Sequence, residues 1–164
     1  MTDSGKFATA SRPEEVYAFL ANPEQFARLL PDFEDMSAED ETHFTVRIGI
    51  AMAKVNGHID LAMNLNEAVP TERIGYRGHG TVAGSQLNFE MQFRMATLDA
   101  LTEICWDGDV ALDGPLAFIA GSVIGTLGGR NFEMIADKLR RALDELSPAV
   151  PNEMSSGYDP DDSC

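Results

Sequence analysis

The sequence predicts an α+β fold in which a curved antiparallel sheet of about six to seven strands wraps around one long C-terminal helix. Three observations lead to this prediction. Apolar and polar residues alternate through most of residues 43 to 112, short turn-forming segments separate the alternating runs, and a helical pattern fills residues 115 to 146. Strands joined by such short turns pair antiparallel, with one face in water and the other in the core.

Length and charge narrow the classes of protein. The chain has 164 residues and a formal net charge of −15, which fits a single domain over residues 1 to 147 and an acidic, disordered tail over 148 to 164. The charge argues against nucleic acid, because phosphate binding needs clustered Lys and Arg. No signal peptide is visible and Cys105 and Cys164 form no disulfide framework, so we expect a cytoplasmic protein.

Two short helices are predicted near the start of the chain, after a first strand. Pro13 suits the first position of a helix, and the two glutamates that follow it suit the positive end of the helix dipole. The pair Asn22-Pro23 ends this helix and opens a second one. After Leu30-Pro31 the pattern changes to that of strands.

The strand region shows a two-residue period. In the segment LNFEMQFRM, residues 87 to 95, the apolar residues occupy one parity and the polar residues the other. The following run alternates in the same way from Thr102 to Leu112. Turns are predicted at VNG, VPTE, GHGTVAG and LDA, so neighbouring strands form hairpins.

The long helix has two halves with different apolar faces. In the second half, one stripe is predicted to face the sheet and contains Phe132, Ile135, Leu139, Ala142, Leu143 and Leu146. Extended backward, this stripe meets small residues, whereas the bulky residues of the first half fall on the opposite side. An unbroken helix would leave a cavity over the sheet and an exposed apolar patch for a membrane, a dimer mate or a partner. A break at Gly128-Gly129 would instead let the first half bury its bulky face.

The sequence resembles the G-subunit family of carbon monoxide dehydrogenase, within the START-like (SRPBCC) superfamily of helix-grip proteins. The resemblance covers about residues 5 to 146 and departs from the family at Asp32, where Gly is usual, and at the end of the last helix. An opening motif carries it through Pro13, Glu14, Val16, Phe19, Leu20, Pro23, Leu30 and Pro31, and a later motif through Thr102, Trp106, Gly114, Leu116, Ala117 and Gly121.

The resemblance implies a pocket between sheet and helix for a hydrophobic molecule such as a quinone or lipid. It also implies assembly of a molybdenum hydroxylase of the carbon monoxide dehydrogenase type, or its recruitment to the inner face of the membrane. The predicted lining comprises Ile48, Ile50, Leu61, Met63, Tyr76, Phe89, Met91, Phe93, Ile104, Trp106, Phe118, Gly121 and Gly125. The predicted membrane or partner contacts are Leu116, Ile119, Val123, Ile124 and Leu127, with a homodimer as a further possibility.

No catalytic or metal-binding constellation stands out, and we expect no cofactor. The three histidines have no metal-ligand spacing and are expected at the surface, as is the carboxylate series Asp107, Asp109 and Asp113. Methionines on the apolar parity suit either core packing or an adaptable pocket lining. Two alternatives to a binding module stay open: a cyclase or dehydratase using Tyr76 or Arg77, and an assembly chaperone with a filled interior.

Overall fold

A computed structural model describes the backbone of residues 2–52, 55–82, 84–114 and 117–146. Within these ranges, it describes every side chain except those of residues 50–52, 55–56, 82 and 117–130. The tail predicted over residues 148 to 164 lies outside the described residues. The described part forms one antiparallel sheet of seven strands in the order β1-β7-β6-β5-β4-β3-β2.

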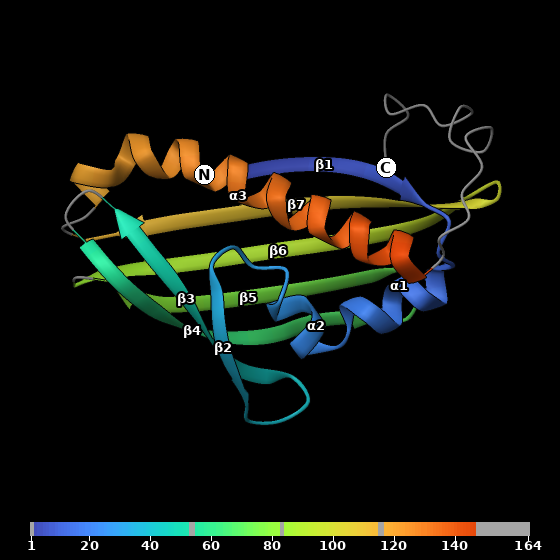
Figure 1. Ribbon diagram of the computed structural model, residues 1–164, viewed down its shortest axis with the longest axis horizontal. Coiled ribbons are helices and arrows are strands. Elements are labelled where there is room, and N and C mark those ends of the chain that lie inside the picture. Colours follow the sequence, from blue (N-terminus) through green and yellow to red (C-terminus); the bar gives the residue numbers. More distant parts are fainter. Residues whose placement is uncertain (1, 53–54, 83, 115–116, 147–164) are drawn as a thin grey trace.

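The sheet and helices follow one another as predicted for an α+β fold. All three helices lie on one face of the sheet, and α3 runs across it (Figure 1). The elements are β1 (Thr2–Thr9), α1 (Pro13–Leu20), α2 (Pro23–Ala27), β2 (Phe33–Ala38), β3 (His43–Met52), β4 (Val55–Val69), β5 (Arg73–Val82), β6 (Ser85–Leu98), β7 (Leu101–Asp113) and α3 (Ala117–Leu146).

Local signals explain the two short helices. Pro13 and Pro23 stand in the first turns of α1 and α2, where a missing N–H removes no helical hydrogen bond. The Asn22 side chain accepts hydrogen bonds from the backbone N–H groups of Glu24 and Gln25, which caps α2. Both helices therefore begin where the sequence predicted.

Three strand assignments differ from the sequence-based expectation. The segment VNG, residues 55 to 57, was predicted as a turn but lies at the start of β4. The segment Phe33–Ala38 forms edge strand β2, which the polar sequence FEDMSA did not predict. The glycine-rich segment GHGTV was predicted as a turn, but His79 lies within β5 and the strand continues to Val82. Glycine suits this inward position of β5 because the Met63 side chain of β4 fills the space beside it. A Cβ on Gly78 would overlap the Met63 sulfur.

The long helix is continuous, which decides between the two alternatives raised by Gly128-Gly129. Its described second half packs on the sheet through Phe132, Ile135, Leu139 and Leu143, all at most 2% exposed. The predicted stripe ends earlier than expected, because Leu146 in the last turn is 54% exposed.

Hydrogen bonds fix the C-terminal end of α3 to the start of the chain. The buried Ser11 hydroxyl donates to the Leu143 carbonyl oxygen at 2.7 Å. The Thr102 hydroxyl of β7 donates to the Ser11 carbonyl oxygen, also at 2.7 Å. Residues more than 90 positions apart in the sequence are thus joined at this end of the sheet, which holds the second half of α3 in place.

Candidate functional site

The concave face of the sheet, which faces the helices, is the candidate site. Cross-strand register aligns its inward-facing residues in rows, such as Tyr76, Met91 and Gly108 on β5, β6 and β7. Phe93 and Trp106 form the next row toward the anchored end of α3, and Phe89 and Val110 the next row toward its first half. The site therefore has two ends that can be compared row by row.

The end beneath α1, α2 and the second half of α3 is closed by aromatic packing. The Tyr76 ring stacks on Phe26 with centroids 3.9 Å apart and meets Phe44 edge-on at 5.9 Å. Phe26 also meets Phe93 edge-on at 6.2 Å. These four side chains are at most 1% exposed, so this end is a packed core.

Tyr76 is a structural residue of that core. Its hydroxyl donates a 2.6 Å hydrogen bond to the Leu20 carbonyl oxygen at the end of α1. Burial, with a smaller contribution from Tyr17, raises the pKa of the Tyr76 hydroxyl well above its ordinary value. A neutral hydroxyl already bonded to the backbone is poorly suited to acid–base catalysis.

The close approach of α3 to the sheet occurs at Gly108. A Cβ placed on this residue would lie 2.4 Å from ring carbons of Phe132, which is closer than side-chain atoms pack. The Phe132 ring covers the glycine and stacks against Phe89 with centroids 5.8 Å apart. Gly108 was not among the predicted site residues, although a glycine within an alternating strand, here in Asp-Gly-Asp, can mark a close approach.

Beyond Phe132, toward the first half of α3, inward-facing residues become half-buried. Phe89 on β6 and Val110 on β7 pack against the core without being enclosed by it. Leu87 and Leu112, one row farther along, are half-buried as well. These apolar side chains face the helices and still retain exposed area, so the packing is looser at this end than at the Tyr76 end.

The predicted lining residues divide between these two ends. The structure places most of them in the closed core and leaves some at the looser end, while the remainder fall outside the described side chains. The core holds Leu61, Met63, Tyr76, Met91, Phe93, Ile104 and Trp106, whereas Ile48 and Phe89 are half-buried. The side chains of the other predicted lining residues, Ile50, Phe118, Gly121 and Gly125, are not described. The same holds for the predicted membrane or partner contacts Leu116, Ile119, Val123, Ile124 and Leu127.

Titratable groups are scarce on the concave face. Among the described inward-facing positions of β3 to β7, Tyr76 is the one side chain with an ionisable group. Arg77 points to the other face, where its Nε donates to Glu90 at 2.9 Å. No group of His, Cys, Asp and Glu within the described residues has the arrangement to hold a metal ion.

Cys105 lies on the outer face of β7, is 4% exposed and is disulfide-bonded. The expectation concerned a disulfide framework, which one bonded cysteine does not make. The second cysteine of the sequence, Cys164, lies outside the described residues.

Comparison with known proteins gives a family match and a fold. The family model that matches residues 5–144 describes the G subunit of carbon monoxide dehydrogenase (CoxG). A comparison with curated proteins found no match. In the described part of the chain, none of the helices has the run of apolar residues that a membrane span requires.

Solved structures with low sequence identity share the architecture. A conserved protein from Geobacillus kaustophilus is 16% identical with a TM-score of 0.74, covering 88% of this chain and 96% of that one. A START superfamily protein from Mycobacterium smegmatis is 14% identical with a TM-score of 0.64, covering 88% and 98%. The Aha1 dimer from Colwellia psychrerythraea is 14% identical with a TM-score of 0.53, covering 87% and 96%. These likenesses confirm the START-like helix-grip fold.

Proposed function

Because the chain belongs to the G-subunit family of carbon monoxide dehydrogenase (CoxG), we propose that it is a non-catalytic module that binds a hydrophobic small molecule, a quinone or a lipid, on its concave face. The guest lies between the first half of α3 and the half-buried end of the sheet. In this proposal the module is cytoplasmic and serves the assembly of a molybdenum hydroxylase or its recruitment to the inner face of the membrane.

The observation that carries the proposal is the difference between the two ends of the concave face. At the Tyr76 end, aromatic rings and the second half of α3 leave side chains at most a few percent exposed. At the other end, Leu87, Phe89 and Val110 face the helices and remain half-buried. An apolar guest that covers such exposed apolar surface removes it from water. This contributes about 25 cal/mol per Å² to the free energy of binding.

The scarcity of ionisable groups favours binding over catalysis. A cyclase or dehydratase needs a titratable side chain inside the apolar site. Tyr76 is the described candidate, and its hydroxyl is held by the Leu20 carbonyl oxygen. An enzyme of this kind would therefore have to place its chemistry on residues outside the described inward-facing set.

Native mass spectrometry of gently purified protein, followed by organic extraction, tests the proposal. We expect a quinone or lipid to be recovered, or a short-chain ubiquinone to bind when it is added. Val110→Phe places a larger side chain at the half-buried end and should reduce occupancy, because Val110 faces the concave side.

Ala111→Phe is the matched control, since Ala111 is the next residue on β7 and points to the opposite face. Equal occupancy in Val110→Phe and wild type would contradict the proposed location. A protein that carries no guest, takes up no ubiquinone and still copurifies with a molybdenum enzyme would favour the chaperone alternative.

A further inference from the structure

The outer face of the sheet, away from the helices, contains a groove with a volume of about 500 Å³. One side of the groove is a row of directly paired residues that crosses five strands. The row consists of His43 on β3, Asn64 on β4, Arg77 on β5, Glu90 on β6 and Asp109 on β7. Ala62, His79 and Asn88 form the neighbouring row.

We propose that this groove docks a basic segment of a partner protein, in an extended conformation and rich in Arg or Lys. The proposal is independent of the guest on the concave face, because it concerns the opposite face of the sheet. Three features of the groove support it: its charge, its hydrogen-bonding groups and its length.

Carboxylates outnumber cationic side chains along the groove. Glu39, Glu90 and Asp109 line it, against Arg77. The neighbouring outer-face arginines do not alter this balance, because each has its own carboxylate: Arg47 binds Asp60 at 2.8 Å, and Arg94 binds Asp107 at 3.2 Å. The groove therefore keeps an excess of carboxylates over cationic side chains.

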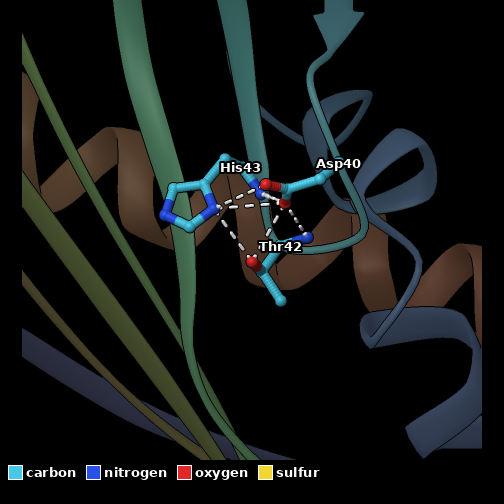
Figure 2. Close-up of polar contacts among 3 residues, drawn as sticks. All are labelled: Asp40, Thr42 and His43. Atoms are coloured by element: carbon cyan, nitrogen blue, oxygen red, sulfur yellow. Dashed lines mark hydrogen bonds and ion pairs between the residues drawn. The ribbon is translucent and has the colours of Figure 1, made fainter.

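A fourth carboxylate lies beside the β3 end of the groove. Asp40 accepts hydrogen bonds from the backbone N–H of Thr42 at 2.8 Å and of His43 at 2.7 Å, and its carboxylate lies 3.1 Å from His43 Nδ1 (Figure 2). These hydrogen bonds, with the Thr42 backbone contributing most, lower the pKa of Asp40 to about 2. Asp40 therefore stays ionised at neutral pH and adds negative charge next to His43.

The groove already holds one guanidinium group, that of the chain itself. Arg77 Nε lies 2.9 Å from Glu90 Oε1, and the two side chains are 64% and 37% exposed. Exposed ion pairs of this kind contribute only about 0.2–1 kcal/mol, so an incoming guanidinium can replace Arg77 on Glu90 at little cost. Asn64, Asn88 and His79 line the same groove and offer hydrogen bonds to a peptide backbone.

The length of the groove favours a peptide segment over a single ion. From β3 to β7 it crosses four inter-strand spacings of about 4.8 Å, or about 19 Å in all. An extended segment advances about 3.3 Å per residue, so about six residues fill this distance. A metal ion is a poor occupant, because no described group of His, Cys, Asp and Glu has a metal-binding arrangement.

The three histidines of the chain provide an internal test. His43 and His79 line the groove, whereas His58 lies on the outer face of β4 outside it. A peptide of about six residues alternating Arg and Gly is titrated into the full-length protein while the imidazole ring signals are followed by NMR. We expect the His43 and His79 signals to shift and the His58 signal to stay in place.

Charge-matched variants separate a specific groove from general attraction to an acidic protein. Glu39→Gln/Glu90→Gln removes two carboxylates from the groove, and Glu14→Gln/Glu133→Gln removes two exposed carboxylates from α1 and α3. The groove variant should bind the peptide about tenfold more weakly, which corresponds to about 1.4 kcal/mol. The helix variant should bind within about twofold of wild type, because its lost charges are distant and screened by salt.

Several outcomes would overturn the proposal. Equal shifts of all three histidines, equal weakening in both double variants, or no binding at low ionic strength would each show that the groove has no preference for a basic segment. A wild-type dimer that dissociates in the groove variant would show that the occupant is a second copy of this chain.

Discussion

Gly108→Ala directly tests how closely α3 approaches the sheet. The added Cβ would lie 2.4 Å from two carbons of the Phe132 ring, whereas unbonded carbons pack at about 3.5–4.0 Å. Either the backbone that carries the added Cβ or the Phe132 ring must therefore move by about 1 Å or more. Phe132 is 2% exposed and lies against Phe89 and Trp106, with ring centroids at 5.8 and 6.5 Å, so a shift of the ring disturbs both contacts.

The cost follows from overpacking. Inserting a methyl group into a packed core destabilises a protein by about 1–3 kcal/mol, which for a domain of this size lowers Tm by about 2–12 °C. Urea unfolding followed by fluorescence suits the measurement, because Trp106 is the only tryptophan of the chain and lies beside Phe132. We expect the midpoint to fall with little change in the slope.

Gly49→Ala and a double-mutant cycle are the controls. A Cβ on Gly49 meets its nearest atom, Asp32 Cβ, at an ordinary 3.7 Å, so this substitution should be neutral or stabilising by up to about 1 kcal/mol. Phe132→Leu should cost less in the Gly108→Ala background than alone, with a coupling energy of about 0.5–3 kcal/mol. Additive effects, or a Gly108→Ala as mild as Gly49→Ala, would refute the contact between α3 and β7.

Three further substitutions test the core and the turn beside the groove. Tyr76→Phe should lower the free energy of unfolding by about 1–3 kcal/mol, because it leaves the Leu20 carbonyl oxygen buried without its donor; denaturant titration measures this, and an unchanged stability would contradict the bond. Ser11→Ala should cost about as much through the Leu143 carbonyl oxygen, and hydrogen exchange should increase at the end of α3 if that bond anchors it. The pKa of Asp40 falls from 3.8 to about 2 on folding, so its contribution to stability is present above pH 4 and is lost between about pH 4 and 2. Unfolding measured as a function of pH should show no such loss in Asp40→Asn. Identical pH profiles of wild type and Asp40→Asn would contradict this role of Asp40.

Much of the fold could be predicted because strand patterns are local. The parity of residues 87 to 95 correctly identified the inward face of β6, and the proline positions correctly identified the two short helices. Edge strand β2 was missed because its exposed side chains are polar and carry no alternation. The glycines of β5 were misassigned to a turn because their role depends on Met63 of the neighbouring strand filling the space above Gly78.

Other features could not be predicted because they depend on contacts between residues far apart in the sequence. The bond from Tyr76 to Leu20 joins residues 56 positions apart, and no local pattern announces it. His43 and His79 looked like unrelated surface histidines, yet the register of three adjacent strands brings them to one groove. Asp32, in contrast, is a local feature that the sequence did reveal. Its φ of 55° is the left-handed conformation that glycine adopts most easily, which explains why glycine is usual at this position in the family.

The two proposed sites share a single layer of strands, and this makes them separable by experiment. Along β6, Asn88, Phe89 and Glu90 all border the outer groove, but Phe89 lies on the inward parity and packs against the core. A strand turns alternate side chains to opposite faces, so Val110→Phe alters the concave side, whereas Glu39→Gln/Glu90→Gln alters the outer side. We expect Val110→Phe to lose the guest and keep peptide binding, and Glu39→Gln/Glu90→Gln to do the reverse. A variant that binds its own ligand like wild type would refute that proposal and leave the other standing. Loss of both in a single variant would instead indicate a damaged sheet, which the Trp106 unfolding midpoint would reveal.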